Sequence, residues 1–125
     1  MVRRWGDPVR LITDTELLFP ETAVAIAVLE TGHFRSRSMM KHHNYFGFRG
    51  NRRGFQIRVQ RGYGVYATGK AMMADYQAWE QEICARHGLT SEAAFRRWIY
   101  RHYAEDPHYS TKLATAISEV VLTLR

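Results

Sequence analysis

The sequence predicts a mostly helical α+β domain with a small, basic β-lobe near its middle. The chain has 125 residues, of which 46% are hydrophobic and 13% aromatic, so it can form one modest core and is not expected to be disordered. Apolar residues recur at helical spacing on both sides of residues 44–68. That central segment instead alternates aromatic or aliphatic residues with arginines and contains five glycines. We therefore expect a single domain over residues 1–125.

The first helices are predicted from their caps and breakers. A short helix is expected over residues 7–17, with a proline in its first turn. A second is expected over residues 21–31, between a proline and a glycine. Its run AVAIAVL has no polar face, so protein should surround this helix on all sides. Residues 38–43 should add one helical turn.

The β-lobe, residues 44–68, is predicted to form an antiparallel hairpin or a three-stranded sheet with tight turns. Its clearest strand is FQIRV, residues 55–59. The segment EDPHYS near the C-terminus should be a turn. Three more helices are expected. The first covers residues 70–87, and the second begins after a cap at Thr90 or Ser91 and ends at about Tyr103. The third begins after a cap at Ser110 and ends at Leu124.

The formal net charge of +6 favours an anionic partner such as nucleic acid, a membrane surface or an acidic wall polymer, although many basic proteins have none. The lone cysteine, Cys84, excludes an intramolecular disulfide and a cysteine-based metal site. The histidines form no ligand motif, so neither a metal nor another cofactor is expected. No apolar run is long enough for a signal peptide or a membrane span.

Glu30 is the one acid at the end of the apolar helix. Desolvation and the negative end of the helix dipole should both raise the pKa of its carboxyl. A carboxylic acid that stays protonated near neutral pH can protonate the leaving oxygen of a glycoside. The residues alone leave open that Glu30 reaches solvent or binds a backbone amide.

Several motifs follow in order along the chain. They are Glu-x-Gly-x-x-x-Ser at residues 30–36, Asn-Tyr-Phe-Gly at 44–47, ADYQAW at 74–79 and Tyr-Ala-x-Asp-Pro-x-Tyr at 103–109. Over residues 20–117 this set resembles the bacterial N-acetylglucosaminidases of glycoside hydrolase family 73, the flagellar-rod and autolysin type, which have a lysozyme-like fold. Tyr45 stands where the family has leucine.

The resemblance implies a peptidoglycan hydrolase that cleaves the β-1,4 bond after N-acetylglucosamine. Glu30 would be the general acid, and Tyr103 would orient the acetamido group of the substrate or stabilise developing charge. The partner would be peptidoglycan glycan strands, bound by a monomer in the periplasmic or extracellular cell wall, with no nucleic acid or membrane required. Substrate contacts are expected from Ser36, Asn44, Tyr45, Phe46, Tyr63, Tyr66, Asp106 and Tyr109.

Two of these contacts have structural alternatives. Packing between sheet and helices is the favoured interpretation for Phe46, and Asn44 could equally stabilise a turn. The aromatic residues Tyr45, Tyr63 and Tyr66 are expected to flank the cleft, where rings can stack on sugars.

The sequence departs from the family in one respect. Where the family has a second acid, it lies in the β-lobe, but residues 31–74 contain no Asp or Glu. The next acid, Asp75, is expected to serve helix packing. Three possibilities remain: attack by the substrate's own N-acetyl group, Glu30 as both acid and base as in lytic transglycosylases, or a relative that binds the wall without cutting it. A basic nucleic-acid-binding ribbon is the rival from another class.

Overall fold

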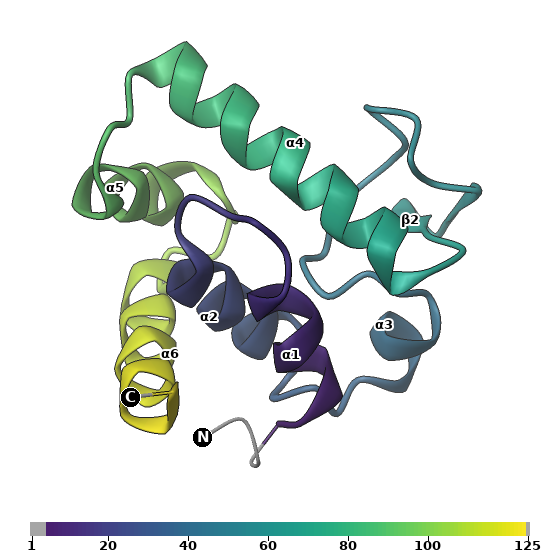
Figure 1. Cartoon of the computed structure of the whole chain (residues 1–125), viewed down its shortest axis with the longest axis horizontal. Coiled ribbons are helices and arrows are strands. Elements are labelled where there is room, and N and C mark those ends of the chain that lie inside the picture. The colour runs from purple at the N-terminus through teal and green to yellow at the C-terminus, as the bar shows by residue number, and fades with distance from the viewer. Residues whose placement is uncertain (1–4, 125) are drawn as a thin grey trace.

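The computed structural model describes residues 5–124 and confirms a mostly helical α+β arrangement, 57% of it helical (Figure 1). The predicted domain, residues 1–125, extends beyond the described residues and stays a prediction. The elements are α1 (Asp7–Thr13), α2 (Pro20–Glu30), α3 (Arg37–Lys41), β1 (Arg58–Gln60), β2 (Tyr63–Val65), α4 (Gly69–His87), α5 (Glu92–His102) and α6 (Tyr109–Leu124).

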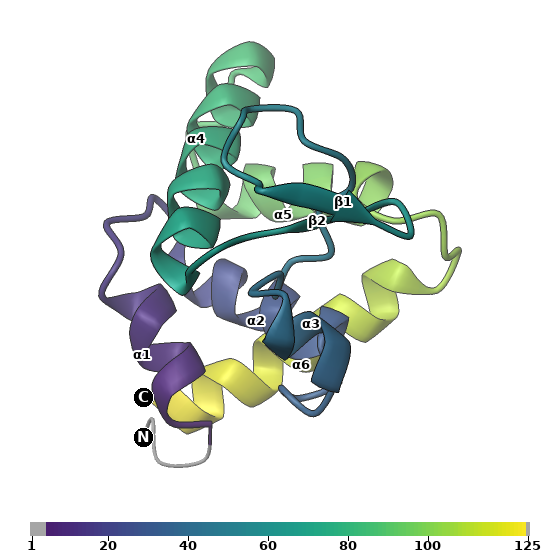
Figure 2. The same ribbon diagram turned by 90° about the vertical axis from the view of Figure 1, so that its right-hand side faces the viewer.

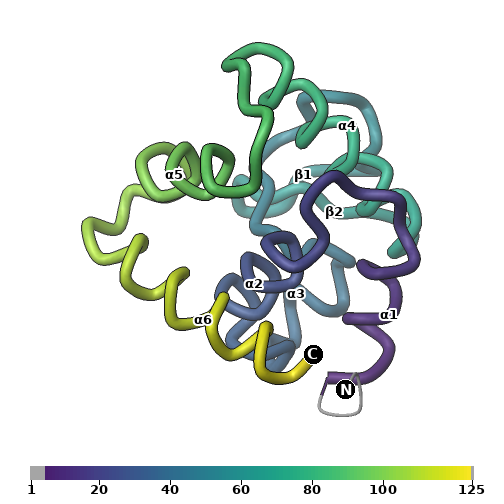
Figure 3. The backbone as a smooth tube through the Cα atoms, turned by 60° about the vertical axis from the view of Figure 1, so that its left-hand side comes forward, coloured from purple at the N-terminus to yellow at the C-terminus, as the bar shows by residue number. Residues whose placement is uncertain are grey.

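Helix α2 lies at the centre of the molecule, between α1 and α6 (Figure 3). Its seven consecutive residues from Thr22 to Val28 are all buried. This confirms the prediction from its apolar sequence, because a helix without a polar face is stable only when protein covers it all round. The carboxyl end of α2 leaves the core at Leu29 and Glu30, which are half-buried.

The β-lobe is smaller than its sequence suggests. Strands β1 and β2 form a two-stranded antiparallel hairpin that lies between α4 and α3 (Figure 2). Its two-residue turn has positive φ at both Arg61 and Gly62, at 53° and 86°, which matches the twist of paired strands. The third strand of the three-stranded alternative is reduced to one bridge between Arg49 and Tyr63.

The predicted strand at residues 55–59 begins only at Arg58. Before it, Gln56 turns its side chain inward to Tyr66 and Asp75. Among the described residues, only one backbone hydrogen bond, from the N–H of Ile57 to the carbonyl of Val65 at 2.8 Å, continues the pairing before Arg58, and the inward turn of Gln56 ends it.

Most helix ends lie within two residues of their predicted positions, and the end of α1 and the start of α6 are two of the differences. Helix α1 ends at Thr13, before the predicted residue 17. The backbone N–H groups of Leu18 and Phe19 donate to the Glu80 carboxylate of α4, at 2.8 and 3.2 Å, and not to carbonyls of a continued helix. Helix α6 begins at Tyr109, so Ser110 lies inside the helix and does not cap it.

Asp75 joins the β-lobe to α4. Its carboxylate is fully buried and accepts hydrogen bonds from Arg53, from Gln56 at 3.0 Å, and from the hydroxyl of Tyr66. Burial of a charge requires such partners. The expectation that this acid serves packing is therefore confirmed.

Candidate active site

Glu30 is the last residue of α2, and the turn after it is sharply defined. The Thr31 hydroxyl donates to the carbonyl of Ala27 at 2.6 Å and accepts the N–H of Phe34 at 2.8 Å. Gly32, His33 and Phe34 then adopt positive φ, at 60°, 61° and 64°. The chain thus leaves the helix abruptly, and the Glu30 side chain stands at the boundary between core and cleft.

Burial raises the pKa of the Glu30 carboxyl above its ordinary value. The hydroxyl of Tyr109 approaches this carboxyl from α6 and lowers the pKa by a smaller amount. The Tyr109 hydroxyl is itself buried and, among the described residues, has no partner at hydrogen-bond distance and angle, so its contact with Glu30 is a loose one. The direction of the net shift is the one predicted from the sequence.

Gly47 brings the backbone of the β-lobe directly against Glu30. A Cβ atom at this position would lie 2.8 Å from Glu30 Oε1, and the residue has φ of +68°. The positive φ favours glycine, and a side chain at this position would also push the Glu30 carboxyl out of its place.

Asn44 holds the loop that carries Gly47. Its side-chain amide donates to the carbonyls of Phe48 and Gly64, both at 2.9 Å, and its oxygen accepts the N–H of Phe48 at 3.0 Å. Both amide hydrogens are thus used within the protein. Of the two interpretations of Asn44, the structure displays the turn-stabilising one.

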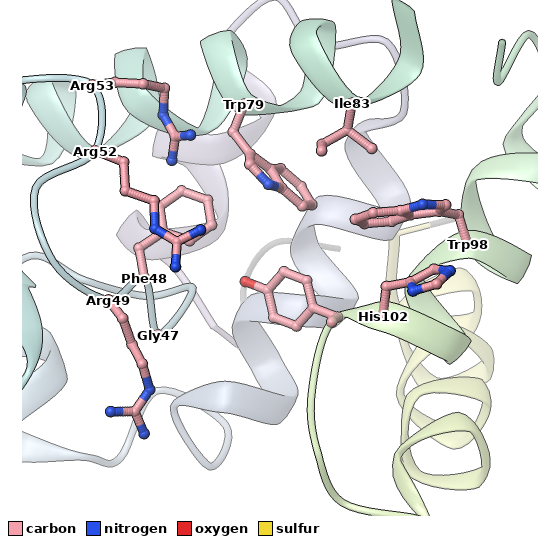
Figure 4. A pocket seen from close by; sticks show the side chains of 10 residues that line it. Gly47, Phe48, Arg49, Arg52, Arg53, Trp79, Ile83, Trp98 and His102 are labelled. Atoms are coloured by element: carbon pink, nitrogen blue, oxygen red, sulfur yellow. The ribbon is translucent and has the colours of Figure 1, made fainter. Parts of the chain in front are cut away.

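Glu30 lines two adjoining cavities. The larger, of about 820 Å³, lies between the β-lobe and the end of α5, and the smaller, of about 350 Å³, lies between α3 and the hairpin. Tyr63 borders both cavities. A third cavity, of about 320 Å³, shares Gly47, Arg49, His102 and Tyr103 with the larger one (Figure 4). The three form one cleft with Glu30 near its middle.

Tyr103 follows α5 and lies on the cleft wall. Its hydroxyl donates a hydrogen bond to the carbonyl of Phe46. Burial, together with the nearby Tyr109 and Glu30, raises the pKa of this phenol well above its ordinary value. The hydroxyl therefore stays protonated, and its oxygen keeps lone pairs for another donor.

Four of the predicted contact residues line the cleft or adjoin its acid, and Asn44 is one of them, on the wall of the smaller cavity. Ser36 lines the smaller cavity and caps α3 by accepting the N–H of Met39. Tyr63 is 40% exposed, and Tyr109 is buried beside Glu30.

The remaining aromatic predictions require correction. The side chains of Tyr45 and Tyr66 are buried in the core and do not flank the cleft. Phe46 is buried as well, so it follows the favoured packing interpretation and not the alternative of a substrate contact. Phe46 packs on Tyr76, with ring centroids 4.2 Å apart, and the Tyr66 hydroxyl is committed to Asp75. Phe46 and Tyr66 thus contact α4, whereas the Tyr45 ring packs against Phe34, with ring centroids 5.8 Å apart.

Asp106 also serves the fold. Its carboxylate accepts the backbone N–H of His108 at 2.8 Å and pairs with Lys112 at 2.6 Å, at the start of α6. It lines none of the three cavities of the cleft.

Glu105 is a cleft residue that the sequence analysis did not identify. It is exposed, and with Glu30 it lines the larger cavity. Of the described residues on the walls of the three cavities, only these two carry carboxylates. Its neighbour Tyr103 was identified, but a sequence gives no sign that residue 105 faces residue 30 across a cleft.

Within residues 5–124 no cluster of His, Cys, Asp or Glu is arranged to hold a metal ion. The described helices include none that is long and apolar enough to cross a membrane.

Over residues 10–122, the chain matches the sequence model of the glucosaminidase family, described as mannosyl-glycoprotein endo-beta-N-acetylglucosaminidase. No curated protein and no solved structure matches it closely enough to count as similar.

Proposed function

The chain belongs to the glucosaminidase family, and we propose that it hydrolyses peptidoglycan at the β-1,4 bond after N-acetylglucosamine, with Glu30 as general acid. Membership makes it a glycoside hydrolase of the endo-β-N-acetylglucosaminidase type. One observation carries the role of Glu30: its carboxyl, with a pKa raised by burial, lines the middle of a continuous cleft. A protonated acid at that position can donate to a glycosidic oxygen.

The first step would break the bond between the anomeric carbon and the leaving oxygen. Glu30 gives its proton to that oxygen while the carbonyl oxygen of the substrate's own acetamido group attacks the anomeric carbon. Water then attacks the same carbon, reopens the ring formed by the acetamido group, and returns a proton to the Glu30 carboxylate. Glu30 thus ends in the state in which it began.

Tyr103 would position the acetamido group. Its hydroxyl proton is directed to the carbonyl of Phe46, so its oxygen can accept the N–H of the acetamide. That contact would aim the acetamide carbonyl at the anomeric carbon.

Substrate assistance is supported by the shortage of other carboxylates. The β-lobe contains none, and Asp75 is buried in its own network. Among the described residues of the cleft walls, Glu105 carries the one other carboxylate, and its alternative role as a base is tested below. Peptidoglycan as substrate implies action in the cell wall, periplasmic or extracellular. Because one chain supplies every wall of the cleft, we propose that it acts as a monomer.

Purified peptidoglycan tests this proposal. Wild-type protein should release fragments with reducing N-acetylglucosamine ends, and Glu30→Gln should release them about 10²- to 10⁴-fold more slowly. Glu16→Gln, at an exposed position outside the cleft, is the matched control and should be unaffected. Equal release by wild type and Glu30→Gln would refute the role of Glu30. The non-catalytic alternatives predict that neither protein releases fragments. Anhydro-muramyl ends would identify a lytic transglycosylase instead.

A further inference from the structure

The third cavity extends the cleft past Tyr103, and we propose that it is a subsite for a sugar that carries a free carboxylate, namely the lactyl group of a muramyl residue without a stem peptide. The inference rests on the proposed function, since it takes the occupant to be part of the glycan strand that passes Glu30. The cavity measures about 320 Å³, at the lower end of the volumes of small-molecule sites, roughly 300–1,000 Å³.

One side of the cavity is aromatic. Trp79 from α4 faces Trp98 and His102 from α5 (Figure 4). Trp79 is fixed by its neighbours, with ring centroids 5.5 Å from Phe48 and 5.6 Å from Tyr103. Trp98 is likewise held beside His102, at 4.9 Å. Rings held in place offer large apolar surfaces to the C–H faces of a sugar at little cost in conformational entropy.

The other side is basic, and its three arginines are not equivalent. Arg53 is bound to the buried Asp75. The Arg49 guanidinium lies 4.4 Å from the ring centroid of Tyr63 and donates to the Tyr63 hydroxyl at 3.1 Å. Both are occupied in holding the β-lobe.

Arg52 is the arginine that remains available. It is exposed, lines the cavity, and forms no ion pair within the part of the chain that the structure describes. A guanidinium binds a carboxylate through two parallel hydrogen bonds, which makes it selective for this group.

A carboxylate on the glycan itself is the occupant that fits both sides. The cavity opens into the one lined by Glu30, so a sugar bound there belongs to the same strand as the bond to be cut. In glycan strands of peptidoglycan from which the stem peptides have been removed, every second sugar carries a free lactyl carboxylate, whereas a neutral N-acetylglucosamine polymer carries none. The aromatic side would bind either sugar, and Arg52 would distinguish them.

Binding to the Glu30→Gln variant of the full chain tests the subsite without cleavage. Calorimetry would compare N-acetylchitotetraose with a peptide-free tetrasaccharide of alternating N-acetylglucosamine and N-acetylmuramic acid. The carboxylated sugar should bind more tightly, and adding Arg52→Gln should weaken it by about fivefold while leaving the neutral sugar unchanged.

Arg58→Gln, at an exposed arginine of β1 outside the three cavities, is the matched control and should alter neither affinity. Trp98→Ala should weaken both sugars, because stacking does not depend on the carboxylate. Equal affinity for the two sugars, or equal losses in the two arginine variants, would overturn the subsite. If wild-type protein bound with this selectivity but released no fragments, the proposed function would fail and the subsite would stand.

Discussion

Replacing Gly47 with alanine would place a methyl group against the Glu30 carboxyl. The new Cβ would lie 2.8 Å from Glu30 Oε1, closer than real Cβ atoms approach another atom, so the loop or the carboxyl must move. A left-handed backbone costs about 1–2 kcal/mol for a residue with a side chain, whereas moving the end of the flexible Glu30 side chain adds little to this cost. We therefore expect the free energy of unfolding to fall by about 1–2 kcal/mol and the Tm by about 5 °C, while the Glu30 carboxyl is displaced.

The variant Gly50→Ala separates the backbone strain from the contact with the Glu30 carboxyl. Gly50 lies in the same lobe with the same φ of +68°, but a Cβ there would meet nothing within 4 Å. This variant should lose only the backbone contribution, about 1–2 kcal/mol, and should keep its activity.

Thermal unfolding by circular dichroism and initial rates of glycan cleavage would be measured where both variants are folded. Gly47→Ala should be far less active than Gly50→Ala, because displacing a reacting group by as little as 1 Å can cost about 100-fold in rate. If the two variants were equally active, Gly47 would have no part in positioning Glu30.

Three further predictions concern the acid and its surroundings. Tyr109→Phe removes the contact that lowers the pKa of Glu30, so this pKa should rise further and the alkaline limb of kcat/KM should move to higher pH; an unchanged limb would contradict this. Asp75→Asn should lower the free energy of unfolding in urea by about 3 kcal/mol because it leaves Arg53 without its buried partner, and a loss within the error of measurement would show that the β-lobe is held otherwise. Glu105→Gln should keep most of the activity and release products with retained anomeric configuration, by NMR, if the substrate's acetamide is the nucleophile. If Glu105→Gln instead lost more than about 100-fold of its activity, and the wild type released products with inverted configuration, Glu105 would be the base that activates water.

Local patterns account for what the sequence predicted well. An apolar run between a proline and a glycine is enough to place Glu30 at the end of a buried helix, and burial then determines the direction of its pKa shift. Asp75 was also assigned to packing from its place within a helical pattern. These inferences need only the neighbours of each residue along the chain.

Local patterns did not show which face of the β-lobe meets the cleft. Alternation divides the aromatic residues into two faces, but only contact with α4 identifies the buried one. Phe46 and Tyr66 therefore lie in the core, while Tyr63 borders both cavities next to Glu30.

By itself the sequence determined the fold class, the acid at the end of α2 and the absence of carboxylates from the β-lobe, because each is a property of consecutive residues. Only the tertiary structure decided which side chains meet across the cleft. Glu105 faces the same cavity as Glu30, although 75 positions separate them along the chain. Arg52 and Arg53 are adjacent and chemically identical, yet Asp75 binds one and leaves the other exposed to the cleft. Such differences arise from distances between elements, which no pattern along the chain contains.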